Sequence, residues 1–127
     1  MAFHKLKNLM NCDGCTCNIF GSLGILPTGH VAMCGIGELV ADLCYGLLGE
    51  DPVREVWTFH PMLVELRKAV PAGLEGICGD CLIHNKCLGA CVAQNYYRTR
   101  RLTAPYWFCQ ESAEAGLFPF SRRRSCA

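Results

Sequence analysis

The chain has 127 residues and a formal net charge of +1, which is the usual size of one domain and leaves no overall field to attract nucleic acid or an acidic membrane surface. No apolar run approaches the roughly 20 residues of a transmembrane helix, and the N-terminus lacks the apolar stretch of about 7 to 15 residues that a signal peptide needs. We therefore expect a single domain over residues 1–127, located in the cytoplasm, without a nucleic-acid or membrane partner.

Cysteine is unusually abundant, with 11 residues in the chain. This content alone is typical of a small secreted disulfide scaffold. However, the count is odd, and many neighbouring cysteines are separated by only one, two, three or five residues, so several cannot pair without straining the backbone. The pattern therefore favours metal binding in a reducing compartment.

The first part of the chain predicts a β-hairpin. Residues 1–11 are mixed in character and indicate a first strand or loop. The apolar runs 23–27 and 30–33 flank the pair Thr28-Gly29, whose glycine tolerates the positive φ of a tight turn. We expect this hairpin to end at Cys34.

An amphipathic helix is predicted over residues 38–48, because apolar side chains recur there at intervals of three and four. Gly49 suits the end of this helix. Cys44 is expected on its buried stripe, as a small apolar side chain without a ligand role.

Two short helices are predicted within residues 52–70. Pro52 and Pro61 suit first helical positions, and Asp51 can cap the first of the two helices. Pro71 is expected to end the second, because proline cannot continue a helix.

The last third of the chain predicts a cysteine-rich loop over 72–91 that leads into a helix over 88–98. A final short helix is predicted over 109–115, ended by Gly116. The region 110–127 is therefore expected to hold this helix and a basic tail. The tail contains Cys126 and three solvated arginines, Arg122, Arg123 and Arg124.

The cysteines follow an ordered spacing. Four of them have the form C-x2-C-x5-C-x3-C, and a fifth follows after 17 residues: Cys78, Cys81, Cys87, Cys91 and Cys109. Upstream, 11 residues separate Cys17 from Gly29, and four more separate Gly29 from Cys34. A short C-x2-C loop suits an iron–sulfur cluster, because it supplies two adjacent thiolate ligands.

This spacing resembles the SPASM domain, the auxiliary-cluster domain of radical SAM peptide-modifying enzymes, over residues 12–109. The resemblance implies a small α+β domain with a β-hairpin and several short helices around two 4Fe–4S clusters. It implies one downstream cluster on four cysteines: Cys78, Cys81, Cys87 and Cys109. It implies an upstream cluster on Cys17, Cys34 and Cys91, with Cys12 as the favoured fourth ligand and Cys15 as the alternative.

The chain lacks the C-x3-C-x2-C triplet with which radical SAM enzymes bind the cluster that activates S-adenosylmethionine. The resemblance therefore implies an accessory rather than an enzyme in its own right, and we assign no catalytic residue. Its expected partners are a radical SAM maturase, a precursor peptide, and an electron carrier such as a ferredoxin or flavodoxin. Two alternatives remain: the C-terminal SPASM portion of a longer radical SAM enzyme, or a zinc or disulfide structural module.

The aromatic and histidine residues near the cysteine motif are expected to support the site. Burial around the downstream cluster is expected to limit solvent access, and His84 can tune the cluster by a hydrogen bond. The side chains expected to be buried there are Val92, Tyr96, Trp107 and Phe108.

Overall fold

The computed structural model describes residues 18–124, and the predictions for residues 1–17 and 125–127 lie outside this range. The described chain begins with three short strands and two 3-10 helices: β1 (Gly24–Ile25), β2 (His30–Ala32), η1 (Gly35–Glu38), η2 (Ala41–Leu43) and β3 (Cys44–Leu47). Helices follow: α2 (Val53–Phe59), α3 (Pro61–Ala69), α4 (Gly76–Asp80), α5 (His84–Cys87), α6 (Val92–Thr99), α7 (Trp107–Glu114) and the 3-10 helix η3 (Phe120–Arg122). The predicted α+β class is confirmed.

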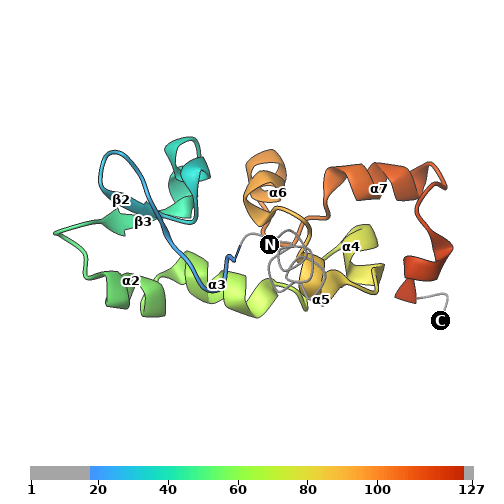
Figure 1. Cartoon of the computed structure of the whole chain (residues 1–127), viewed down its shortest axis with the longest axis horizontal. Coiled ribbons are helices and arrows are strands. Elements are labelled where there is room, and N and C mark those ends of the chain that lie inside the picture. The colour runs from blue at the N-terminus through green and yellow to red at the C-terminus, as the bar shows by residue number, and fades with distance from the viewer. Residues whose placement is uncertain (1–17, 125–127) are drawn as a thin grey trace, which may run out of the picture.

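The molecule is elongated, with the sheet at one end and the cysteine-rich helices at the other (Figure 1). The strands form an antiparallel sheet in the order β1-β2-β3, and α2 lies beside it. Helices α4, α5 and α7 lie at the opposite end, and α3 runs between the two ends. No helix of the described chain is both long enough and apolar enough to cross a membrane.

The predicted hairpin is confirmed by the pairing of β1 with β2. Gly24 lies opposite Ala32, and Ile25 lies opposite Val31. The turn depends on Gly29, whose φ of +85° is a conformation that side chains with a Cβ rarely adopt.

The predicted helix over 38–48 is wrong, because this segment forms η1, η2 and then β3. Residues 44–47 pair with the second edge of β2, which places Ala32 opposite Cys44 and Val31 opposite Gly46. Gly46 is a poor residue for a helix interior, and it also lets β3 approach α2 closely: a Cβ there would lie 3.2 Å from Val56 Cγ2. Cys44 is accordingly a half-buried strand residue and not part of a helical stripe.

The two short helices predicted within 52–70 are confirmed as α2 and α3, but the expected cap is wrong. Asp51 Oδ2 accepts a hydrogen bond from the Leu47 N–H, at 2.9 Å, and α2 has no side-chain cap. Helix α3 is capped by His60, whose Nδ1 accepts a hydrogen bond from the Met62 N–H at 3.2 Å. It ends at Ala69, before the proline that limits it.

The helices of the cysteine-rich end differ in their limits from the prediction. Helix α6 begins at Val92, later than predicted, and α7 begins at Trp107, two residues earlier than predicted. The predicted loop over 72–91 contains the short helices α4 and α5. The later start of α6 follows from the positive φ angles of residues 88–90, which interrupt the helical pattern.

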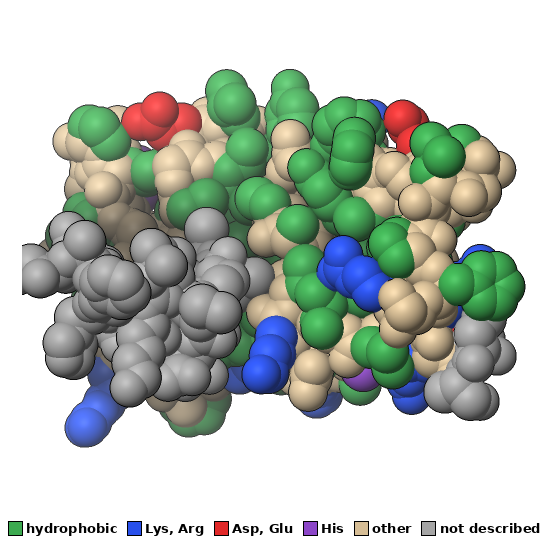
Figure 2. All heavy atoms as spheres, turned by 45° about the vertical axis from the view of Figure 1, so that its right-hand side comes forward, with side chains coloured by type: hydrophobic (Ala, Val, Ile, Leu, Met, Phe, Trp, Pro, Cys, Tyr) green, Lys and Arg blue, Asp and Glu red, His purple; other side chains and the backbone are tan. Residues whose placement is uncertain are grey.

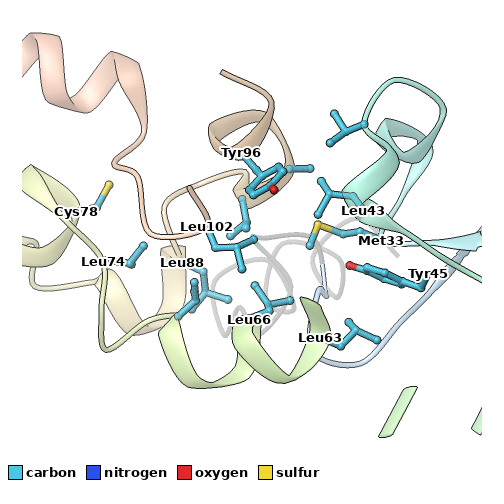
Figure 3. Packing of buried hydrophobic residues seen from close by; sticks show 14 of the residues in the cluster. Met33, Leu43, Tyr45, Leu63, Leu66, Leu74, Cys78, Leu88, Tyr96 and Leu102 are labelled. Atoms are coloured by element: carbon cyan, nitrogen blue, oxygen red, sulfur yellow. The ribbon is translucent and has the colours of Figure 1, made fainter. Parts of the chain in front are cut away.

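One hydrophobic cluster connects the sheet to the cysteine-rich end. Leu43, Tyr45 and Leu66 are buried within it, and Leu74 and Cys78 belong to the same cluster. Figure 3 shows Leu74, Leu88 and Leu102 between Cys78 and the residues that come from the sheet. The cysteine-rich helices therefore pack on the same core as the strands.

We predict that Leu43→Ala and Leu39→Ala have very different effects on stability. In a helix over 38–48 these leucines would share a face, whereas in the structure Leu43 is 0% exposed and Leu39 is 70% exposed. Leu43→Ala should lower the free energy of unfolding by about 2–5 kcal/mol, and Leu39→Ala by no more than about 0.5 kcal/mol. Urea denaturation of the two variants measures this, and equal large losses would contradict the arrangement of η1 and η2, which exposes Leu39 and buries Leu43.

Candidate metal centre

Four predicted ligands line one small cavity, which we call the downstream cavity. Cys78 lies in α4, Cys81 directly follows that helix, Cys87 ends α5, and Cys109 lies in α7. The rest of the lining is mostly apolar or aromatic, and it consists of Ile77, His84, Gly89, Tyr106, Phe118 and Arg122. The structure thus brings together three thiols from helices α4, α5 and α7 and a fourth from the residue directly after α4.

The donor set of the downstream cavity consists of four cysteine thiols. Among residues 18–124, no three Cys, His, Asp or Glu side chains are grouped closely enough to hold one metal ion. A 4Fe–4S cluster is held by four cysteine thiolates, one on each iron, and the cavity is lined by four cysteines. The void itself is about 20 Å³, close to the space of one water, so a cluster requires the thiol side chains to turn outward.

Helix α4 is held against α7 by contacts that involve the neighbours of the cysteines. Gln110 Oε1 in α7 accepts a hydrogen bond from the Ile77 N–H at the start of α4, at 2.9 Å. Gly79, within the C-x2-C loop, passes so close to the Leu74 carbonyl oxygen that a Cβ there would lie 2.2 Å from it. These contacts fix Cys109 relative to Cys78.

The surroundings of Cys78 and Cys109 raise the pKa of both thiols. Burial raises the pKa of Cys78, the Tyr106 N–H that donates to Cys78 Sγ at 3.2 Å opposes this shift, and the other thiols add to it. Burial and the Cys87 thiol raise the pKa of Cys109, whereas the Arg122 guanidinium lowers it. Because a bound metal deprotonates its thiol ligands, cationic iron in this cavity would offset both burial and the repulsion between thiolates.

Cys34 and Cys91 line a second cavity of about 100 Å³, which we call the upstream cavity. Cys34 lies between β2 and η1 and is exposed, whereas Cys91 immediately precedes α6. Cys91 Sγ accepts a hydrogen bond from the Gln94 N–H at 3.4 Å, in the first turn of α6. Ile19 also lines this cavity.

Three of the predicted upstream ligands lie outside the described residues. They are Cys12, Cys15 and Cys17, and their part in the site stays a prediction. Cys126 lies outside this range as well. Cys44 lines neither the downstream nor the upstream cavity.

A left-handed turn separates Cys87 from Cys91. Residues 88–90 have φ angles of 55°, 75° and 62°, and two of the three are not glycine. Asn95, which is only 2% exposed, donates from Nδ2 to the Gly89 carbonyl oxygen at 2.8 Å. This backbone conformation is rare outside glycine, and the buried amide stabilises it.

The prediction that Val92, Tyr96, Trp107 and Phe108 surround the downstream site is wrong. None of the four expected side chains lines the downstream cavity. Val92 lines the upstream cavity, Tyr96 is buried in the core, and Phe108 is 58% exposed. Trp107 is half-buried, and its ring packs beneath the Arg98 guanidinium.

Sequence reasoning missed Tyr106, Phe118 and Arg122 as residues of the downstream cavity. Tyr106 belongs to the aromatic run before Cys109, which is a usable signal, but nothing local marks Phe118 or Arg122. His84, which was singled out, does line the cavity, and its Nδ1 lies 2.9 Å from the Cys81 carbonyl oxygen. A hydrogen bond between these two atoms holds the imidazole at the loop.

Comparisons with protein-family models, with curated proteins and with solved structures find no match to this chain. A functional proposal therefore depends on the spacing of the cysteines and on the geometry of the two cavities.

Proposed function

We propose that this chain is a SPASM-type iron–sulfur protein that binds two 4Fe–4S clusters and assists a radical SAM peptide maturase. The observation that carries the proposal is the separation of Cys87 from Cys91. Only three residues lie between them, yet Cys87 lines the downstream cavity and Cys91 lines the upstream cavity. Two-cluster proteins use closely spaced cysteines in this way, with one member of a motif reaching the other cluster.

The downstream cluster would be held by the four thiols that share a cavity: Cys78, Cys81, Cys87 and Cys109. When bound, such a cluster supplies one-electron redox chemistry. The chain contributes a largely apolar cavity, a hydrogen bond from the Tyr106 N–H to Cys78 Sγ, and a nearby guanidinium from Arg122. Hydrogen bonds, burial and charge are the means by which proteins set cluster potentials.

The upstream cluster would be held by Cys34 and Cys91 together with Cys17, and Cys12 is the proposed fourth ligand, with Cys15 as the alternative. Support for Cys17 comes from Ile19, which lines the upstream cavity and is only two positions further along the chain. Two residues span at most about 7 Å, so a ligand at position 17 suits this cavity.

The proposed role is accessory, because the chain lacks the C-x3-C-x2-C triplet of a radical SAM site. The two clusters would relay electrons to the maturase from a carrier such as a ferredoxin or flavodoxin, or position the precursor peptide. This chemistry belongs in the reducing cytoplasm, where thiolates and iron–sulfur clusters persist. The alternative is that the chain is the C-terminal SPASM portion of a longer radical SAM enzyme, and a barrel-encoding region immediately upstream in the same reading frame would decide for it.

Anaerobic reconstitution with iron and sulfide tests the proposal. We expect about eight irons and about eight labile sulfides per chain, with broad absorption near 400 nm that bleaches on reduction, since each of two cubane clusters carries about four of each. The protein is also purified from cells grown with both iron and zinc, so that zinc can compete for the cysteines. Stoichiometric zinc without labile sulfide would show that the chain is a structural zinc module.

Cys91→Ala tests how the ligands divide between the clusters. We expect Cys91→Ala and Cys34→Ala to lose the upstream cluster, because both cysteines line the upstream cavity. Cys81→Ala should instead lose the downstream cluster. Iron and sulfide content should fall by about half in each case. Electron paramagnetic resonance of the reduced proteins identifies the remaining cluster, and a Cys91→Ala spectrum matching that of Cys81→Ala would contradict the division.

A further inference from the structure

The segment after α7 returns to the cysteine loop, contrary to the expectation of a solvated basic tail. Helix α7 ends near Gly116, whose φ is +73°, and the Leu117 N–H donates to the Ser112 carbonyl oxygen at 2.8 Å. The chain then descends at the end of the molecule, and η3 lies next to α4 (Figure 1). We call residues 118–124 the strap.

Backbone pairing attaches the strap to the end of the C-x2-C loop. The Leu82 N–H donates to the Arg122 carbonyl oxygen at 2.8 Å, and Arg123 forms an antiparallel bridge with Cys81. Because these contacts use main-chain atoms, they do not depend on the identity of the Arg122 side chain.

Side chains of the strap add two further contacts with the same loop. Arg123 Nε donates to Asp80 Oδ2 at 3.0 Å, and both side chains of this ion pair are partly buried. Arg124 donates to the Gly79 carbonyl oxygen at 3.2 Å. The strap is thus attached at four consecutive positions, residues 79–82, at the end of α4 and just after it. The expectation of solvated arginines is wrong for Arg122 and Arg123, which are half-buried, whereas Arg124 is exposed.

Two strap side chains, Phe118 and Arg122, line the downstream cavity beside the thiols. The Arg122 guanidinium carbon lies 5.5 Å from the centre of the Phe118 ring, within the range of a cation–π contact. Stacking on the ring directs a permanent positive charge toward the cysteines, since guanidinium does not lose its proton. The surface at this end carries other Lys and Arg side chains among hydrophobic ones (Figure 2), but Arg122 is the one that lines the cavity.

We propose that the strap closes the downstream cavity, with Phe118 excluding solvent and Arg122 raising the reduction potential of the cluster bound there. The proposal rests on the iron–sulfur function proposed above, and it adds two residues outside the cysteine motif to that site. Reduction adds one electron to the cluster, and a fixed positive charge beside it favours the more negative, reduced form. An aromatic ring over the cavity limits access of water and of competing metal ligands.

The test uses the reconstituted full chain and four variants in two matched pairs. Arg122→Gln is compared with Arg54→Gln, which removes the same charge from an exposed residue of α2, outside both the strap and the cavity lining. Phe118→Ala is compared with Phe120→Ala, because Phe120 is 74% exposed and also lies outside the cavity lining. The downstream cluster is identified as the signal that Cys81→Ala loses.

Redox titration with dithionite, followed by electron paramagnetic resonance, should show that Arg122→Gln makes reduction of the downstream cluster less favourable. The expected change is about tenfold in the equilibrium constant, which is about 59 mV for a one-electron couple. Arg122→Lys should restore the potential, and Arg54→Gln should leave it near the wild-type value. Phe118→Ala should release iron to a chelator severalfold faster than wild type, whereas Phe120→Ala should not.

Two results would overturn the strap proposal, and only the second would also overturn the iron–sulfur function. If wild type holds both clusters but Arg122→Gln and Phe118→Ala behave like their controls, the strap has no role in the site, and the iron–sulfur proposal stands. If wild type holds no iron and no labile sulfide, the function itself is wrong, and the strap proposal fails with it.

Discussion

The hydrogen bond from Asn95 Nδ2 to the Gly89 carbonyl oxygen stabilises the turn on which the division of the cysteines depends. If α5 continued into α6 as one helix, Cys87 and Cys91 would be four residues apart on the same face and would point into one site. The positive φ angles of residues 88–90 interrupt the helix instead, so the second cysteine becomes the first residue before α6. Cys87 and Cys91 therefore line different cavities, on either side of a turn that one buried amide stabilises.

The cysteine-rich end is assembled from helices of four to eight residues, which have little stability in isolation. They are held by packing on the shared core and by links between segments that are distant in sequence. Tyr96 OH donates to Asp42 Oδ2 at 2.7 Å and connects α6 to the 3-10 helix before β3. Gln110 connects α7 to α4, and the strap covers the loop that follows. Metal binding at four thiols would add a further cross-link between these segments.

The sequence was sufficient for features with a local cause. The turn at Thr28-Gly29 and the proline-limited helices α2 and α3 both follow from residues within a short window. The helix over 38–48 fails because pairing of Cys44–Leu47 with β2 outweighs a helical hydrophobic pattern, and pairing between distant segments is not encoded locally.

The parts of the candidate site that the sequence did not predict come from the same kind of long-range contact. Phe118 and Arg122 reach the downstream cavity only because the chain reverses after α7, and a run of arginines near a chain end is ordinarily solvated. Asn95 has no distinguishing neighbours in the sequence, and its role becomes visible only when its amide is seen beneath the turn. The contacts of these residues therefore become visible only in the fold.

The most direct measurement of the central claim is anomalous diffraction at the iron absorption edge from crystals of the anaerobically reconstituted chain. We predict two separate four-iron peaks, one bounded by Cys78, Cys81, Cys87 and Cys109 and the other bounded by Cys34 and Cys91. A single peak, a peak at the zinc edge only, or iron density that joins Cys91 to Cys87 in one cluster would contradict the account.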